Sequence, residues 1–523
     1  MSVGTEIRIR RIQAVNPATG EILRELDCAD SAQVHDCVRL ARAAQPEWQA
    51  TLVKKRLAIV KNFQDLLNDR KLRIAQTITS ETGKPVAEAL LTEVLVVLDG
   101  SRFLQNSAYD FLQQQPVPHS SLATKTKRGR LLREPHGVIG IISPWNYPFS
   151  IPATEVLAAL VTGNAVVLKP SEFTSLSALE LSSLLSDAGI PEHVFQVVIG
   201  DGATGAALVE SGIDKLVFTG SVATGKRIAQ NAAARLLPVV LELGGKDPMI
   251  VLEDADIDVA SSGAVWGAFV NAGQACLSVE RCYVHKDIYA KFLSACVEKT
   301  RQLRVGNGLH DETDLGPLIH DRQVRIVEQH VQDAVSQGAR LLIGGERLKS
   351  LGPNFYAPTV LADVNHQMSI MREETFGPVL PVMAFNSDVE AVRLANDSEY
   401  GLAASVWTRN RARGEKIARQ IQAGTVMIND AVSCFGISEA PHGGVKASGI
   451  GRTHGRFGLE EMVRVKYIDS DLLPGIKKPW WYGYGPRLSA AVEGFLDFQF
   501  ASGLNARIRG ATRSVGLVLR KRR

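Results

Sequence analysis

Glu242 and Cys276, 34 positions apart, are the two residues whose types and surroundings are best suited to catalysis. Glu242 ends the apolar run Val239-Val-Leu and is followed by Leu-Gly-Gly. An apolar setting raises the pKa of a carboxyl group toward the range of a general base. Cys276 follows Asn-Ala-Gly-Gln-Ala, and such small neighbours would leave a thiolate accessible as a nucleophile. A paired structural acid and an inert core thiol are the alternatives, and both stay open at this point.

The loop from Phe218 to Gly225 reads Phe-Thr-Gly-Ser-Val-Ala-Thr-Gly, after a predicted strand and before a predicted helix. Gly220 permits a tight turn and Ser221 can cap the helix, whose free N–H groups would favour a pyrophosphate. Because the loop departs from the GxGxxG pattern, an ordinary strand-to-helix turn explains it equally well.

A lysine and an acid follow another predicted strand, in the stretch Val167-Leu-Lys-Pro-Ser-Glu172. Dinucleotide-binding folds place an acid here to accept hydrogen bonds from the adenosine ribose, and Glu172 has that position. Since a carboxylate would repel a 2′-phosphate, NAD is favoured as cofactor and NADP is left open. The alternative is a solvated helix start capped by Ser171 or Thr174, with Lys169 as a surface charge.

The elements that must position these residues follow from the apolar pattern. Residues 30–115 have helical periodicity and no obvious chemistry. From residue 138 onward, short apolar runs alternate with helical stretches, which predicts a doubly wound parallel α/β sheet of about five strands and a second α/β unit. The predicted strands are 138–142, 165–168, 194–198, 215–218 and 239–241, then 281–285, 339–343, 378–385, 405–408 and 425–429. Ligand pockets in such folds lie at the carboxyl ends of strands and between domains.

The net charge of +4 conceals an uneven distribution. Seven basic residues and no acid occupy the last 23 positions, so the rest of the chain has a net charge of −3 (4 − 7). A net negative charge does not favour binding of nucleic acid. The six cysteines form no CxxC pair and have no histidine at metal-ligand spacing, so neither a metal site nor disulfides are expected, and the cytoplasm is the expected compartment. Neither a signal peptide nor a transmembrane stretch is predicted.

Seven motifs in order resemble the aldehyde dehydrogenase superfamily, and the resemblance runs from about Asn16 to about Ile468. They are PWNYP (144–148), LKPSE (168–172), FTGS (218–221), LELGGK (241–246), GQAC (273–276), EETFGP (373–378) and GGVKASGIGR (443–452).

The resemblance implies catalytic and cofactor roles for particular residues. Cys276 would be the nucleophile, Glu242 the base, and the Asn146 side chain a donor to the oxyanion. Lys169 and Glu172 would hold the adenosine ribose, and Gly220 and Ser221 the pyrophosphate, with Gly225 packing the helix close. Glu374 would bind the nicotinamide ribose and Phe376 would lie against the nicotinamide. The candidate cofactor residues are Trp145, Lys169, Glu172, Gly220, Ser221, Gly225, Glu374 and Phe376.

The resemblance also implies a domain organisation. An NAD-binding domain would cover 1–115 and 133–244, and a catalytic domain 245–445. Oligomerisation and bridging segments would cover 116–132 and 446–469, including a hairpin to which 124–133 contributes, and 470–523 would be a basic C-terminal extension. Family members are usually homodimers or homotetramers. Because relatives that pass the acyl group to coenzyme A need no deacylating base, Glu242 favours hydrolysis to a carboxylic acid.

The substrate is less well determined by the sequence. Relatives specific for succinic semialdehyde resemble one another in carrying an Arg in the helix after PWN(F/Y)P, but Ser150-Ile-Pro-Ala-Thr-Glu155 has no basic residue. Ala275 and Leu277 flank Cys276, which favours a long-chain or aromatic aldehyde; succinic semialdehyde is the alternative. A catalytically silent protein on the same fold is the alternative from another class, and it is disfavoured because the thiol and the base are both present.

The C-terminal extension combines aromatic residues with an amphipathic, Arg-rich stretch. This composition suits peripheral contact with an anionic membrane surface. An extension packed on a neighbouring subunit is an equally good interpretation.

Overall fold

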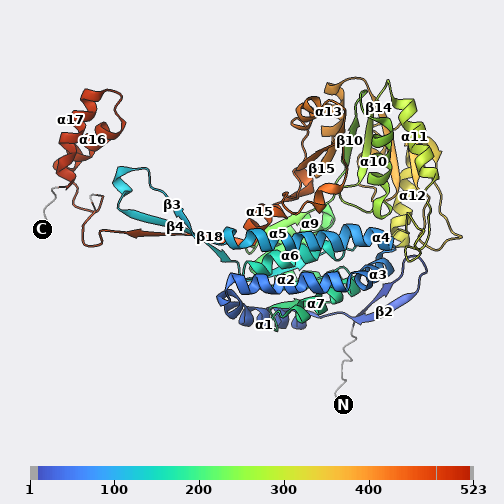
Figure 1. Ribbon diagram of the computed structural model, residues 1–523, viewed down its shortest axis with the longest axis horizontal. Coiled ribbons are helices and arrows are strands. Elements are labelled where there is room, and N and C mark those ends of the chain that lie inside the picture. Colours follow the sequence, from blue (N-terminus) through green and yellow to red (C-terminus); the bar gives the residue numbers. More distant parts are fainter. Residues whose placement is uncertain (1–9, 479, 519–523) are drawn as a thin grey trace, which may run out of the picture. The chain divides into compact units, whose positions relative to one another are not determined.

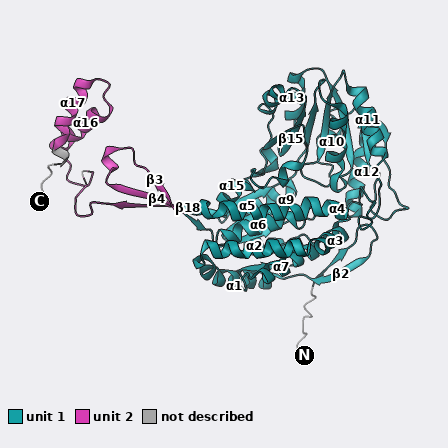
Figure 2. Cartoon of the chain, viewed as in Figure 1, with its two compact units in different colours: residues 1–113, 133–465 teal, residues 114–132, 466–523 magenta. Residues whose placement is uncertain are grey.

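The computed structural model describes residues 10–478 and 480–518, in two units that are coloured separately in Figure 2. One unit comprises 1–113 and 133–465, and the other 114–132 and 466–523. Arg520, Lys521, Arg522 and Arg523 of the basic tail lie outside the described residues.

The first sheet of the larger unit carries all five strands predicted for the first block. Its order is β17-β9-β8-β5-β6-β7, and the five predicted strands run parallel, while β17 pairs antiparallel with β9. The strands are β5 (Val138–Ile142), β6 (Ala165–Lys169), β7 (Phe195–Val197), β8 (Lys215–Thr219), β9 (Val239–Glu242) and β17 (Gly449–Ile450). β17 was not predicted, because two residues carry no periodicity.

Helices cover both faces of this sheet, as expected of a doubly wound fold (Figure 1). Ile139 and Ile141 of β5 belong to one apolar core, and Val138 and Ile142 belong to the other. Burial on both faces explains why β5 reads as a continuous apolar run. The helices are α1 (Ser31–Ala50), α2 (Val53–Asp69), α3 (Lys71–Thr82), α4 (Val86–Ala89), a π-helix (Leu90–Val94), α5 (Leu95–Phe111), α6 (Ser150–Val161), α7 (Ser175–Ala188), α8 (Gly202–Glu210) and α9 (Val222–Ala233).

The second sheet, in the same unit, has the order β12-β13-β14-β11-β10-β15-β16. It is parallel except for the antiparallel pair β12 and β13. Its strands are β10 (Asp247–Val251), β11 (Val279–His285), β12 (Arg340–Ile343), β13 (Thr359–Ala362), β14 (Val379–Phe385), β15 (Ala403–Trp407) and β16 (Thr425–Ile428). β10 and β13 were not predicted. Its helices are α10 (Ile257–Phe269), α11 (Tyr289–Arg301), α12 (Asp321–Ser336), α13 (Asp388–Asn396) and α14 (Arg411–Ala418). The predicted domain boundary at 244–245 lies in the link between β9 and β10.

The remaining elements lie at the two ends of the chain and in the smaller unit. β1 (Arg11–Val15) and β2 (Ile22–Asp27) form a hairpin, and α15 (Gly455–Glu461) precedes β18. The predicted hairpin segment contributes to a three-stranded sheet of order β18-β4-β3, made by β18 (Val463–Asp471), β4 (Lys127–Pro135) and β3 (Gln115–Val117). Two helices, α16 (Pro486–Phe500) and α17 (Leu504–Val518), follow. Across residues 10–478 and 480–518, no helix combines the length and apolar content needed to cross a membrane.

Candidate active site

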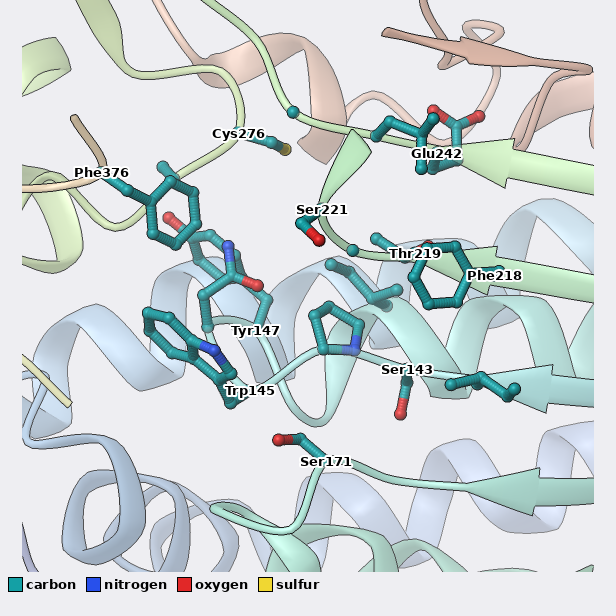
Figure 3. Close-up of a pocket in the computed structure, with 18 of the residues that line it drawn as sticks. Ser143, Trp145, Tyr147, Ser171, Phe218, Thr219, Ser221, Glu242, Cys276 and Phe376 are labelled. Atoms are coloured by element: carbon teal, nitrogen blue, oxygen red, sulfur yellow. The ribbon is translucent and has the colours of Figure 1, made fainter. Parts of the chain in front are cut away.

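A cavity of about 1090 Å³ in the larger unit collects the carboxyl ends of β5, β6, β8 and β9 and the loop that carries Cys276 (Figure 3). Of the eleven residues predicted from the sequence, ten line it, and Gly225 does not. In Figure 3 the Cys276 sulfur points into the cavity on the side of Glu242, and the rings of Trp145 and Phe376 lie together on the other side. The sequence motifs therefore converge on one pocket.

Cys276 follows a strained turn at the end of α10. Asn271 and Ala272 have φ of 53° and 56°, in the left-handed region that non-glycine residues rarely adopt. The half-buried thiol has a pKa well above its ordinary value, first because of burial and then because of the nearby Asp247, Glu374 and Glu242 carboxyl groups. The resting thiol is therefore protonated, and nucleophilic attack requires a proton acceptor.

Asn146 is hydrogen-bonded to the Cys276 loop through both its side chain and its backbone carbonyl. Its side-chain Nδ2 donates to the Gln274 carbonyl at 3.0 Å, and its own carbonyl accepts from Asn271 Nδ2 at 2.9 Å. An amide NH₂ carries two hydrogens, so the group that bonds Gln274 has a second N–H to offer a ligand in the cavity. The pairing fixes an amide donor close to the thiol.

A fully buried ion pair is hydrogen-bonded to the loop that carries Asn146. Lys84 Nζ lies 2.7 Å from a Glu93 carboxylate oxygen and also donates to the Asn146 carbonyl at 2.8 Å. The other Glu93 oxygen accepts from the backbone N–H groups of Phe149 and Ser150 at 3.1 and 2.7 Å. Lys84 and Glu93 lie in the 30–115 segment in which no chemistry was predicted, and no sequence signal distinguished them from surface charges.

Glu242, the candidate base, is buried at the end of β9 beside Thr219 of β8. Neither of its carboxylate oxygens has a hydrogen-bond partner among the described residues, and His442 Nε2 is 3.9 Å away. Burial and the neighbouring Glu155 raise the pKa of Glu242 well above its ordinary value. A raised pKa makes the ionised Glu242 carboxylate a stronger base than an ordinary glutamate.

Glu155 of α6 is a second buried carboxyl group in the same cavity. It accepts a hydrogen bond from the Thr219 hydroxyl at 3.4 Å, and burial raises its pKa to about 8. In the sequence, Glu155 is notable only as part of the stretch 150–155, which has no basic residue.

The loop between β8 and α9 has the predicted cap. The Ser221 hydroxyl accepts from the Thr224 N–H at 3.3 Å, and the Gly220 N–H donates to the Glu242 carbonyl at 3.0 Å. Gly225 lies in the first turn of α9, where a Cβ atom would come within 2.5 Å of the Leu243 side chain. Gly225 therefore brings α9 close to the end of β9 and does not itself face the cavity.

Lys169 and Glu172 lie together where β6 ends. The Lys169 ammonium is 3.4 Å from the Glu172 carboxylate, and burial lowers the pKa of Lys169. Because 37% of the Glu172 side chain is exposed, its carboxylate can receive a polar ligand.

Glu374 and Phe376 belong to a loop that a second buried ion pair holds. Glu280, paired with Lys246, accepts from the Thr375 and Phe376 backbone N–H groups at 2.9 and 2.8 Å. Glu374 accepts from the Gly245 N–H at 3.1 Å, and burial raises the pKa of its carboxyl group to about 8. The Phe376 ring meets Trp145 edge-on, with ring centroids 5.4 Å apart.

The residues present fit a dinucleotide. The N-terminus of α9 can present its first turn to a diphosphate, Lys169 and Glu172 offer polar partners to a ribose, and Glu374 lines the same cavity. The cavity volume exceeds the usual range for small-ligand pockets.

The wall of the cavity that α6 and α10 help to form is apolar. Tyr147, Ile151, Val270 and Ala275 pack as one cluster, and Val432 and Phe435 pack against it. Of these residues only Ala275 was expected to contact the substrate; Tyr147 lies in the PWNYP motif but had no role assigned to it, and Val270, Val432 and Phe435 lie outside the seven motifs. Further apolar side chains on the cavity are Leu91, Val96 and Trp266.

Comparisons with known proteins agree with this site. The family model described as "Aldehyde dehydrogenase family" matches residues 5–468. A 4,4'-diapolycopene aldehyde oxidase from a Methylomonas species is 41% identical over 492 residues, covering 93% of this chain and 91% of that protein. A mitochondrial succinate-semialdehyde dehydrogenase from Oryza sativa subsp. japonica is 38% identical over 464 residues, covering 88% and 86%. An aldehyde dehydrogenase from Bacillus cereus, solved in complex with NAD+, has a TM-score of 0.85 at 36% identity, covering 88% of this chain and 94% of that one.

The resemblance carried by the seven motifs is thus confirmed, and solved neighbours include both an NAD+ complex and an NADP-dependent enzyme. The chain belongs to the aldehyde dehydrogenase family, and it is an enzyme that oxidises an aldehyde with NAD or NADP.

Proposed function

We propose that Cys276 is the nucleophile of this oxidation and that Asn146 stabilises the oxyanion. The Cys276 thiol gives its proton to water in the cavity, the resulting thiolate adds to the aldehyde carbon, and the carbonyl oxygen takes the negative charge of a thiohemiacetal. The free N–H of the Asn146 amide and the backbone N–H of Cys276 meet that charge. Collapse of the thiohemiacetal expels a hydride and leaves a thioester on Cys276. A bound nicotinamide supplies the hydride acceptor.

Glu242 then serves as the base for hydrolysis. It takes a proton from a water that attacks the thioester carbon, and the C–S bond breaks to release the carboxylic acid and the Cys276 thiolate. The absence of a hydrogen-bond partner for either Glu242 oxygen among the described residues supports this role, because such a carboxylate can bind a water.

The dinucleotide is assigned to the groove across β6, β8 and α9. Lys169 and Glu172 bind the adenosine ribose, and Gly220 and Ser221 bind the diphosphate. Glu374 binds the nicotinamide ribose, and the rings of Trp145 and Phe376 lie against the nicotinamide. Gly225 acts by holding α9 in place. Glu172 favours NAD, so Glu172→Gln should raise kcat/KM with NADP relative to NAD, whereas Glu192→Gln, an exposed control, should not.

The aldehyde is an apolar one, long-chain or aromatic. One observation carries this proposal: the cluster of Tyr147, Ile151, Val270 and Ala275 that packs with Val432 and Phe435 on the cavity. The lysine and arginine residues that line the cavity lie elsewhere: Lys169 ends β6, Arg227 lies on α9, and Arg322 lies on α12. His442 and His454 pack on the Phe435 ring, but burial lowers their pKa values to about 3 and about 4, so neither supplies a cation there near neutral pH. The relative named for 4,4'-diapolycopene aldehyde supports an apolar substrate as well.

Succinic semialdehyde is the second candidate. Relatives named for that activity are 37–39% identical and cover 86–88% of the chain. A carboxylate-bearing substrate would need a cation at the apolar wall, and none of the wall residues supplies one.

A kinetic comparison tests the substrate. We expect kcat/KM to be higher for decanal and benzaldehyde than for succinic semialdehyde, with either cofactor. Phe435→Ala should lower kcat/KM for decanal about tenfold, since lost apolar contact with a substrate costs about 1–3 kcal/mol. Phe457→Ala, an exposed phenylalanine away from the cavity, is the matched control. A higher kcat/KM for succinic semialdehyde would contradict the proposal.

The proposal extends to partners and location. The β3–β4 hairpin and β18 support self-assembly into a homodimer or homotetramer, and the six unpaired cysteines support a cytoplasmic setting. We also assign residues 470–523 to peripheral membrane contact. The alignment with the Methylomonas relative covers 93% of this chain, which is about 486 of its 523 residues (0.93 × 523). A stretch of that length must extend beyond residue 468, where the family match ends, so the relative shares part of the C-terminal extension.

A further inference from the structure

The last two helices pack on each other through small residues. Among residues 486–515, the buried positions of this helical hairpin are Ala491 and Gly494 of α16 and Gly510 of α17. A Cβ on Gly494 would lie 2.3 Å from Arg513 Cβ, and one on Gly510 would lie 2.3 Å from the Phe498 nitrogen. The two backbones are therefore in close contact, and no larger side chain fits between them.

Most of the large apolar side chains whose burial is described in the hairpin are exposed instead, while Leu488 and Phe495 are partly buried. Phe500 is 69% exposed and Leu504 is 74% exposed. A water-soluble helical hairpin turns its large apolar side chains toward its own seam, so this one is inverted. Its exposed apolar residues are Val492, Leu496, Phe498, Phe500, Leu504, Ile508 and Val515.

An aromatic segment leads into the hairpin. Trp480, Trp481, Tyr482 and Tyr484 are all exposed, and Tyr482 reaches 92%. Tryptophan and tyrosine are the side chains that accumulate at the headgroup level of membranes, because one end of the ring is apolar and the other is polar.

The segment that contains the aromatic residues and the hairpin has a positive net charge. From Leu472 to Val518 the chain carries six basic and two acidic residues, and all three charged residues of α17 are arginines. Self-association would bring two arginine-bearing helices together, whereas anionic lipid headgroups would neutralise them. Since no described helix can cross a membrane, the fitting position is in the plane of the interface.

We infer that the surface formed by Trp480–Tyr484 and the outward faces of α16 and α17 binds an anionic phospholipid membrane. The apolar side chains enter the acyl boundary, and Arg507, Arg509 and Arg513 contact the headgroups. This inference rests on the proposed peripheral contact and specifies its residues and its lipid. It also fits an apolar aldehyde, which would partition into the same membrane.

Sedimentation of the full-length protein with vesicles tests this surface. We expect the protein to sediment with phosphatidylcholine vesicles that contain phosphatidylglycerol, to do so much less with phosphatidylcholine alone, and to be released by salt. The triple variant Arg507→Gln, Arg509→Gln, Arg513→Gln should bind on the order of 100-fold more weakly, from about 1 kcal/mol per arginine. Leu496→Ser with Phe500→Ser should also release the protein.

Two controls make the outcome decisive. The triple variant Arg39→Gln, Arg102→Gln, Arg411→Gln, at three exposed arginines of the larger unit, should leave vesicle binding unchanged. Oxidation of a short, water-soluble aldehyde should be the same in all variants, so failure of vesicle binding is distinguishable from failure of the proposed catalysis. If the full-length protein stays in solution, or if the serine variant changes only the oligomeric mass in ultracentrifugation, the surface is a contact between subunits and the inference is wrong.

Discussion

Lys84 and Glu93 form an ion pair whose side chains are completely buried, with 2.7 Å between Nζ and the carboxylate. Besides pairing with Glu93, Lys84 donates a hydrogen bond to the Asn146 carbonyl. Glu93 in turn accepts hydrogen bonds from the Phe149 and Ser150 N–H groups. The loop that carries the candidate oxyanion donor is thus held by two charges from distant helical segments. Lys246 and Glu280 hold the Phe376 loop in the same manner.

Glu93→Gln should therefore reduce both stability and turnover. Removing one partner of a buried pair leaves an uncompensated charge, which costs about 3–5 kcal/mol. Urea denaturation should show a lower midpoint, and kcat should fall because the Asn146 loop loses its anchor. Asp65→Asn breaks the exposed Lys61–Asp65 pair and should cost at most about 1 kcal/mol. Equal effects of the two substitutions would contradict a positioning role for Glu93.

Cys276→Ala should abolish NAD reduction, while Cys434→Ala, at a buried neighbouring thiol, should retain most of it. Glu242→Gln should leave acylation possible and slow hydrolysis about 10²–10⁴-fold, the usual contribution of a general base. Intact-mass spectrometry should then detect the acylated enzyme.

In the natural enzyme, deacylation should become faster with rising pH through the raised pKa of Glu242, because only the ionised form accepts a proton. A Cys276→Ala variant with full activity would exclude the mechanism.

Sequence patterns singled out most of the residues that line the candidate site, but not the buried side chains that hold them in place. Cys276, Glu242 and Glu172 follow strands or lie in motifs, so their neighbours in the sequence indicate their surroundings. Lys84 and Glu93 pair with each other, but their link to the site comes from contacts with Asn146 and Phe149, more than 50 residues away, which no local pattern records. The strands β10 and β13 were missed as well, although each is as long as strands that were predicted, such as β5 and β9.

Glu155 should make stability depend on pH. Its pKa is raised to about 8 in the folded protein from 4.5, first by burial, so the folded state binds a proton that the unfolded state releases. This contribution to stability is fully present below pH 4.5 and is lost as pH rises to about 8. Glu155→Gln removes the titration and should flatten the decline in urea midpoint between these two pH values. Glu192→Gln, at an exposed carboxylate, should leave the slope as it is. An unchanged slope in Glu155→Gln would show that Glu155 does not titrate in this range.

Gly225→Ala tests whether close packing of α9 on Leu243 controls the dinucleotide groove. The added Cβ would come within 2.5 Å of Leu243 Cδ2, so either that buried side chain or the start of α9 must shift. We expect KM for NAD to rise several-fold, with a smaller change in KM for the aldehyde, because the helix N-terminus moves away from the diphosphate. Leu243→Ala removes the obstacle, so the double variant should be less impaired in NAD binding than the two single effects predict. Gly503→Ala, where a Cβ meets nothing within 4 Å, is the control for the glycine change itself. Additive effects of the two substitutions would mean that Gly225 acts on the cofactor by some route other than its contact with Leu243.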